Sequence, residues 1–235
     1  MNFELSEEQK MIQQSVERFV QENYDLPKRV EISSKDPGYS KDYWGSMAEL
    51  GWLGLPFNEE DGGFGGNQID TLVIMEQFGK GLVLEPFLAN IVLGGGAIQI
   101  GGSEELKKEI LPSLIEGTKQ ITLAYAEQQS RFDLEDVATS ARLEGNKYII
   151  NGQKSMVLNA ESADHLVVVA RTSGGQVDEK GISLFLVDSN SNGLEKQNFP
   201  TVDGLRASEI TLENVEVSTE RIIGDIDKGF EILRA

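Results

Sequence analysis

The chain has 235 residues, of which 39% are hydrophobic, and this is enough to bury a sizeable core as one large domain or two smaller ones. Its 39 acidic residues outnumber its 21 lysines and arginines, and the formal net charge of −18 argues against nucleic acid as a partner. The charge still leaves room for a local basic pocket that binds a phosphorylated ligand. The absence of cysteine excludes disulfides and thiolate metal sites.

The N-terminus is charged from its first residues and lacks the apolar core of a signal peptide. The longest apolar run, from Ile91 to Ile100, is interrupted by glycines and is too short to span a bilayer. The sequence therefore predicts a cytoplasmic protein without membrane insertion.

The first half of the chain has the periodicity of amphipathic helices. Ser6 and Gln9 form a capping-box pattern, which predicts a helix start. The apolar residues that follow recur on one helical face, namely Ile12, Val16, Phe19 and Val20. Further helices are predicted around residues 44–48, over 69–78, over 86–100, and after the cap residue Ser103, where Leu106, Ile110 and Leu114 share a face.

Two segments, 58–68 and 93–102, are rich in glycine. Neither follows a predicted strand and opens a helix, and neither has the glycine spacing of a phosphate-binding loop. Loop formation and close packing of helices are the favoured roles for these glycines.

From Gln120 onward the hydrophobic period changes to two, starting with Ile121, Leu123 and Tyr125. Short strands are predicted over 148–151, 165–171 and 182–187, with turn signals between them, which favours an antiparallel sandwich or barrel. Near the end of this region, Ile210 and Leu212 have one parity and Val215 and Val217 the other. A β-bulge near Asn214 would return both pairs to one face.

The single histidine, His165, stands at the start of a predicted strand. It has no companion for a metal site, and no nucleophile is directed at it, so we expect a structural role. The final segment GDIDKGFEILRA begins a helix that has no terminating signal before Ala235, so we expect the chain to end inside an element.

Five segments, in the expected order and at the expected distances, resemble the acyl-CoA dehydrogenase family. They are MNFELSEEQKMIQQSVERFV, MAELGWLGLPFNEEDGGFGG, GSEELKKEILPSLIEGTKQITLAYAE, KYIINGQKSMVLNAESADHLVVVART and DGLRASEITLENVEVSTERIIGDIDKGFEILRA. The resemblance implies a multidomain α+β fold. Residues 1–118 would form the helical N-terminal domain, 119–222 the β-barrel-like middle domain, and 223–235 the start of a C-terminal helical bundle that is otherwise missing.

The same resemblance implies an oxidoreductase with FAD between its middle and C-terminal domains. Such enzymes oxidise an acyl-CoA thioester to the 2-enoyl form. A glutamate of the last domain removes the α-proton, the β-hydrogen leaves as hydride to the flavin, and the electrons pass to an electron-transferring flavoprotein. By this pattern the chain contains no catalytic base and no metal site, and residues 1–235 alone are expected to be inactive.

Residues 126–133 resemble the flavin-binding loop of the family, which typically reads Thr-Glu-Pro-Gly-x-Gly-Ser-Asp. Glu127 and Asp133 match its acidic ends, while Ala126 replaces the threonine. Met156 and Leu158 replace an aromatic residue and a threonine that face the flavin ring. Each lost hydroxyl donor is expected to weaken flavin binding by about 1 kcal/mol. The predicted cofactor contacts are Leu123, Tyr125, Ala126, Met156, Val157 and Leu158.

AEQQSRFD followed by DVATSAR is closest in pattern to the pimeloyl-CoA dehydrogenase small-subunit type, a two-subunit branch of the family that acts on dicarboxylic acyl-CoAs. This implies an acyl-CoA substrate, with Arg131 and Phe132 as substrate-binding residues, and a homo- or hetero-oligomer with another acyl-CoA dehydrogenase subunit. Arg131 could instead pair with Asp133 and Glu135. Met156 and Leu158 could instead pack in the core.

Two other functions remain open at this point. In the first, the chain is a non-catalytic partner that has lost flavin binding and scaffolds an active subunit. In the second, it is related to the acyl-CoA or nitroalkane oxidases, which share the fold.

Overall fold

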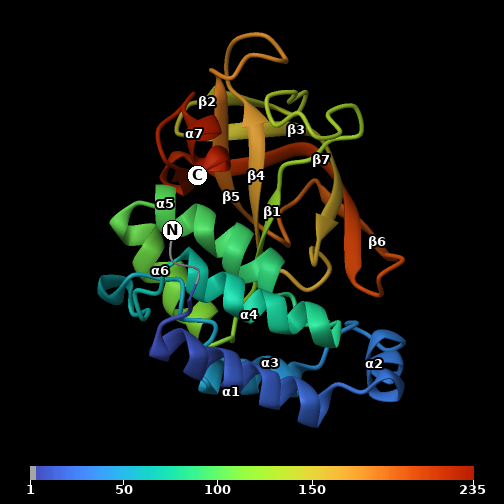
Figure 1. Ribbon diagram of the computed structural model, residues 1–235. Helices are drawn as coiled ribbons and strands as arrows, with labels where there is room; N and C mark the ends of the chain where they lie inside the picture. The colour runs from blue at the N-terminus through green and yellow to red at the C-terminus, as the bar shows by residue number, and fades with distance from the viewer. Residues whose placement is uncertain (1–3) are drawn as a thin grey trace. The chain divides into compact units, whose positions relative to one another are not determined.

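The computed structural model describes residues 4–235 (Figure 1). The first three residues of the segment that resembles the family's first helix lie outside the described residues. The chain divides into two compact units. One runs up to Glu85 and includes Ile115–Gly117, and the other comprises Pro86–Leu114 and Thr118–Ala235.

The first unit is helical. Its first helix begins at the predicted cap, where the Gln9 N–H donates to Ser6 Oγ at 3.1 Å and the Gln9 side chain accepts from the Ser6 N–H at 3.0 Å. Val16 and Val20 of the predicted stripe are buried. The elements of this unit are α1 (Glu7–Asn23), α2 (Leu26–Ser33), α3 (Lys41–Glu49), the 3₁₀ turn η1 (Glu59–Asp61) and α4 (Gln68–Gly81).

The second unit starts with the helix predicted over 86–100, which has an unexpected geometry. Its first part is a π-helix, η2 (Leu88–Gly95), and it continues as α5 (Gly96–Gly101) and, after a break, α6 (Glu104–Ile115). A β-carbon at Gly94 would lie 2.9 Å from the backbone of Ile121, so this glycine allows η2 to pack closely, in agreement with the predicted packing role. No helix among residues 4–235 is long and apolar enough to cross a membrane.

The strands of the second unit form one sheet (Figure 1). They are β1 (Ile121–Ala124), β2 (Ser140–Glu144), β3 (Lys147–Leu158), β4 (His165–Arg171), β5 (Ile182–Asp188), β6 (Leu194–Pro200), β7 (Arg206–Ser218) and β8 (Ile222–Ile223). The order is β6-β7-β3-β2-β4-β5-β8, with β1 beside β4. The short turn η3 (Thr219–Arg221) and helix α7 (Gly229–Arg234) flank β8.

The sheet is mixed rather than purely antiparallel. Most neighbouring strands are antiparallel, but β1 pairs in parallel with β4, and β2 meets β4 in parallel through Ser140 and Arg171. A period of two identifies strands but does not reveal their direction, so the pattern could not predict this pairing.

The bulge predicted near Asn214 is confirmed. Ile150 pairs with Val215 and Gly152 with Leu212, so two residues of β7 lie opposite Asn151 of β3. Asn214 takes a left-handed conformation, with φ of 53°. As a result Leu212, Val215 and Val217 all face the core that fills the sheet.

Candidate functional site

The ends of β1 and β3 lie side by side. The Ser155 N–H donates to the Ala126 carbonyl at 2.9 Å, and the Thr122 hydroxyl donates to the Leu158 carbonyl at 2.6 Å. These bonds bring together the two segments that the sequence assigns to the flavin ring, 123–126 and 156–158.

The predicted cofactor residues differ in exposure. Tyr125 and Met156 are 38% and 51% exposed, and Leu123, Ala126 and Leu158 are half-buried. Met156 therefore does not pack in the core, which was the alternative for this residue. Val157 is the exception in exposure, because its side chain is only 2% exposed and belongs to the core of the sheet. Only its backbone remains available to a ligand.

The surface formed by Tyr125, Ala126 and Met156, called here the Ala126–Met156 edge, also offers a hydrogen-bond donor. The Ala126 N–H has no hydrogen-bond partner within residues 4–235. It adjoins the exposed apolar surfaces of Tyr125 and Met156. A flat aromatic ring with carbonyl oxygens at its rim matches this combination, since apolar side chains cover a ring face while an N–H binds a rim oxygen. The residues present therefore fit a flavin ring, although Ala126 and Leu158 provide no hydroxyl donors.

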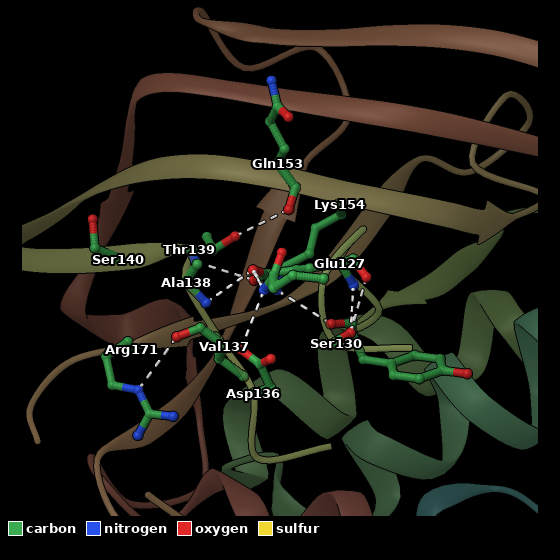
Figure 2. A network of polar contacts seen from close by, with 12 residues as sticks. Glu127, Ser130, Asp136, Val137, Ala138, Thr139, Ser140, Gln153, Lys154 and Arg171 are labelled. Atoms are coloured by element: carbon green, nitrogen blue, oxygen red, sulfur yellow. Dashed lines mark hydrogen bonds and ion pairs between the residues drawn. The ribbon is translucent and has the colours of Figure 1, made fainter. Parts of the chain in front are cut away.

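A buried ion pair fixes the loop that follows β1 (Figure 2). Lys154 Nζ lies 2.6 Å from Glu127 Oε1, and the two side chains are 0% and 4% exposed. The same carboxylate accepts the N–H groups of Ala138 at 2.8 Å and Thr139 at 3.0 Å, and the Gln129 amide at 2.8 Å. Glu127 thereby joins the beginning of the loop to its end and both to β3.

Burial disfavours the charged forms of both partners. It lowers the pKa of Lys154 to about 8, although the Glu127 carboxylate acts in the opposite direction. Burial also opposes ionisation of Glu127. The charge of Lys154 and the hydrogen bonds from Lys154, Gln129 and Thr139 outweigh it and hold the pKa of Glu127 below its ordinary value. Both groups are therefore mainly ionised at neutral pH.

Sequence reasoning recognised Glu127 as the acidic end of the loop but missed its partner. Their separation of 27 positions in the sequence gave no indication of contact. A signal did exist, since Lys154 has the same parity as the core residues Tyr148 and Ile150 on β3. A lysine at a core-facing position requires a buried acceptor.

Arg171, at the end of β4, fixes the far end of the same loop, and this was also missed. Figure 2 shows its side chain beside Val137. Its guanidinium donates to four carbonyls at 2.7–2.9 Å, those of Glu135, Gln176, Asp178 and Lys180. The arginine follows an apolar run with no feature that distinguishes it from a strand-terminating surface residue.

The predicted substrate residues lie at the exposed tip of the loop. Phe132 is 97% exposed, and Arg131 is exposed with a left-handed backbone, φ 49°. Among the described residues Arg131 forms no ion pair with Asp133 or Glu135, so the local pairing considered for it is not observed. Among residues 4–235, no hydrogen bond or ion pair joins Arg131 or Phe132 to Met156.

His165 is the first residue of β4, as expected. Burial lowers its pKa, and its Nε2 has no partner among the described residues. It lies in a pocket separate from the Ala126–Met156 edge, lined by residues such as Asp188, Glu216 and Arg221.

Two family models match the chain. Residues 6–118 match the acyl-CoA dehydrogenase N-terminal domain, and residues 122–215 match the acyl-CoA dehydrogenase middle domain. The chain belongs to the acyl-CoA dehydrogenase family. Acyl-CoA dehydrogenases are oxidoreductases that act on CH–CH bonds, and a flavin cofactor is implied by membership.

A curated relative, "Probable acyl-CoA dehydrogenase YngJ" of Bacillus subtilis, is 32% identical over 98% of this chain and 62% of its own length. One structure of an acyl-CoA dehydrogenase complexed with FAD, from Bacillus anthracis, has a TM-score of 0.86 and 28% identity, over 98% of this chain and 40% of that chain. A structure described as an electron transferring flavoprotein of Acidaminococcus fermentans has a TM-score of 0.87 and 28% sequence identity, over 99% of this chain and 62% of that chain. The chain thus spans less than two thirds of these relatives.

Proposed function

We propose that this chain forms the N-terminal and middle domains, residues 1–118 and 119–222, of an FAD-dependent acyl-CoA dehydrogenase, with 223–235 as the start of a C-terminal domain. The complete protein would convert an acyl-CoA thioester to its 2-enoyl form. The observation that carries the proposal is the junction of Ala126 with Ser155, which joins a free backbone donor to the exposed side chains of Tyr125 and Met156.

Bound FAD would supply a hydride acceptor at this edge. Tyr125 and Met156 would contact the ring and exclude water from it, Leu123 and Leu158 would extend the apolar surface, and Ala126 N–H would hold a rim oxygen. Glu127 and Lys154 would act indirectly, by keeping Ala126 in place. The resemblance assigns the proton-abstracting glutamate to a third domain, so no residue of this chain is proposed as the base.

The substrate and partners belong to the same proposal. Arg131 would bind a phosphate or carboxylate of the acyl-CoA, and Phe132 would add apolar contact, as the exposure of both side chains permits. Electrons would pass to an electron-transferring flavoprotein, and the chain would assemble with a second acyl-CoA dehydrogenase subunit, as in the pimeloyl-CoA type. We also keep the cytoplasmic location as a prediction from the sequence.

The experiment restores the missing hydroxyl. In the complete protein, Ala126→Thr should tighten FAD binding about fivefold, because one neutral hydrogen bond contributes about 1 kcal/mol. Ala126→Val is the matched control, since valine has the shape of threonine without the hydroxyl. Titration of the apoproteins with FAD measures both. Equal affinity of the two variants would contradict a flavin rim beside residue 126.

One observation favours a second function. Neither Ala126 nor Leu158 has a hydroxyl group, which suits a non-catalytic subunit that has lost flavin binding and scaffolds an active one. The complete protein would then show no flavin absorption alone, and its addition to a flavin-containing subunit would change assembly without changing flavin content.

A further inference from the structure

The pairing of β3 with β7 contains a second irregularity, at the candidate site itself. Lys154 pairs with Ile210 and Val157 pairs with Ser208, so Ser155 and Met156 together lie opposite the single residue Glu209 of β7. Such a bulge removes the regular ladder partner of one residue and bends the strand.

The Glu209 carboxylate supplies the missing partner. Its Oε2 accepts the Ser155 hydroxyl at 2.7 Å, and its Oε1 accepts the Met156 N–H at 3.3 Å. On the other side, the Ser155 N–H donates to the Ala126 carbonyl at 2.9 Å. The bulge is therefore held from one side by Glu209 and from the other by the loop that carries Ala126.

Met156 has an unusual conformation for its residue type. Its φ is 52°, in the left-handed region that side chains other than glycine rarely adopt, and its side chain is half-exposed. A left-handed residue persists only where its surroundings enforce it, and such residues cluster at functional sites.

The two bulges between β3 and β7 are built in the same way. In each, the single opposing residue accepts the N–H of a left-handed residue through its side chain, Asn151 Oδ1 from Asn214 at 2.8 Å and Glu209 from Met156. Only the bulge held by Glu209 adjoins Ala126. The bulge at Asn214 therefore provides an internal control.

We propose that Glu209 is a positioning residue of the flavin-facing edge, because its carboxylate holds the bulge that presents Met156 beside Ala126. This inference rests on the proposed function. Glu209 acts through Ser155 and Met156 and need not touch the cofactor.

The test uses the complete protein and three variants, Glu209→Ala, Glu209→Gln and Asn151→Ala. Amide hydrogen exchange of the apoproteins is measured first. Glu209→Ala should speed exchange of the Met156 amide by about tenfold or more, because a hydrogen bond to a carboxylate is lost. Asn151→Ala should instead speed exchange of the Asn214 amide. Unchanged exchange at Met156 in Glu209→Ala would overturn the proposal without reference to flavin.

Titration with FAD then separates positioning from folding. Glu209→Ala should weaken FAD binding about tenfold, since the loss of a charge-assisted bond has that order of magnitude. Asn151→Ala should bind FAD as the wild type does, even with a similar loss of thermal stability. Glu209→Gln should retain most of the affinity for FAD, because its amide oxygen still accepts the Met156 N–H. This variant also keeps the proposal testable if Glu209→Ala does not fold.

The outcomes separate the two proposals. Faster exchange at Met156 with unchanged FAD affinity would overturn the positioning role alone. A wild-type protein that binds no FAD would overturn the proposed function and, with it, the role of Glu209. Equal losses of FAD affinity in Glu209→Ala and Asn151→Ala would show a general effect on stability and also contradict the proposal.

Discussion

The loop between β1 and β2 has two parts with opposite properties. At its base, Glu127 is 4% exposed and is held by donors from Lys154, Gln129, Ala138 and Thr139. At its tip, Phe132 is 97% exposed and Arg131 has no ion pair with its acidic neighbours among the described residues. The base is buried and hydrogen-bonded, as expected of a structural support. The tip is exposed to solvent, as we propose for a ligand-binding surface. If the tip binds substrate, as we propose, stability and binding are separated by a few residues within one loop.

The base illustrates why a buried ion pair is not by itself stabilising. Removing two charges from water costs several kcal/mol, and the pair recovers this cost only when its geometry is good and further hydrogen bonds are present. Glu127 has those bonds, and they extend to both ends of the loop. The pair therefore determines the conformation of the loop.

The largest expected effect is at the base. Lys154→Met leaves the Glu127 carboxylate buried without its counter-charge and should lower the free energy of unfolding by about 3–5 kcal/mol. Lys147→Met is the matched control on the same strand, because Lys147 and Glu216 form an exposed pair at 2.6 Å. It should cost no more than about 1 kcal/mol. Urea unfolding of residues 1–235 measures both, and equal losses would contradict the distinction between base and surface.

The second prediction concerns acid stability. The pKa of Glu127 in the folded protein lies below its ordinary value of 4.5, so its ionised form stabilises the fold above that pH. This contribution is lost as the pH falls below 4.5 through the folded-state pKa. The difference in unfolding free energy between wild type and Glu127→Gln should therefore shrink as the pH is lowered from about 7 to about 3. A difference that stays constant over this range would argue against an ionised Glu127.

The smallest effect on stability is expected at the tip. Arg131→Ala should change the free energy of unfolding by less than about 0.5 kcal/mol, because the side chain is exposed. If Arg131 binds a phosphate or carboxylate of the acyl-CoA, the same variant should lose about 1.5–3 kcal/mol of ligand affinity. Titration of the complete protein with acyl-CoA and FAD checks this. Unchanged affinity for both ligands would exclude a ligand-binding role.

Much of the fold was predictable because local rules and burial agree. The Ser6–Gln9 capping box, the stripe through Val16 and Val20, and the parity change that predicted the Asn214 bulge are all observed. Helix α2 was missed because its eight residues are too few to show a clear hydrophobic period. Asp25 and Pro27 are nevertheless ordinary helix-start residues. Strand β6 was missed because its residues are mostly exposed and polar.

For the site, the family resemblance was informative where local sequence patterns were not. The resemblance brought Ala126 and Met156 together, and the Ser155 to Ala126 bond agrees with this. It also assigned Val157 to the cofactor but gave no information on its side-chain orientation, which depends on the bulge beside it, because one extra residue reverses the faces of a strand. The ion pair of Glu127 with Lys154 and the carbonyl contacts of Arg171 depend on tertiary structure, so no local pattern contains them.

The central claim is that the edge formed by Ala126 and Met156 binds a flavin ring in the complete protein. The most direct measurement is a titration of the complete apoprotein with FAD, followed by visible absorption and by protection of the Met156 amide from hydrogen exchange. Our account predicts saturable binding with a perturbed flavin spectrum and slower exchange at Met156. A complete protein that binds no FAD, or that binds it without any change at Met156, would contradict the account.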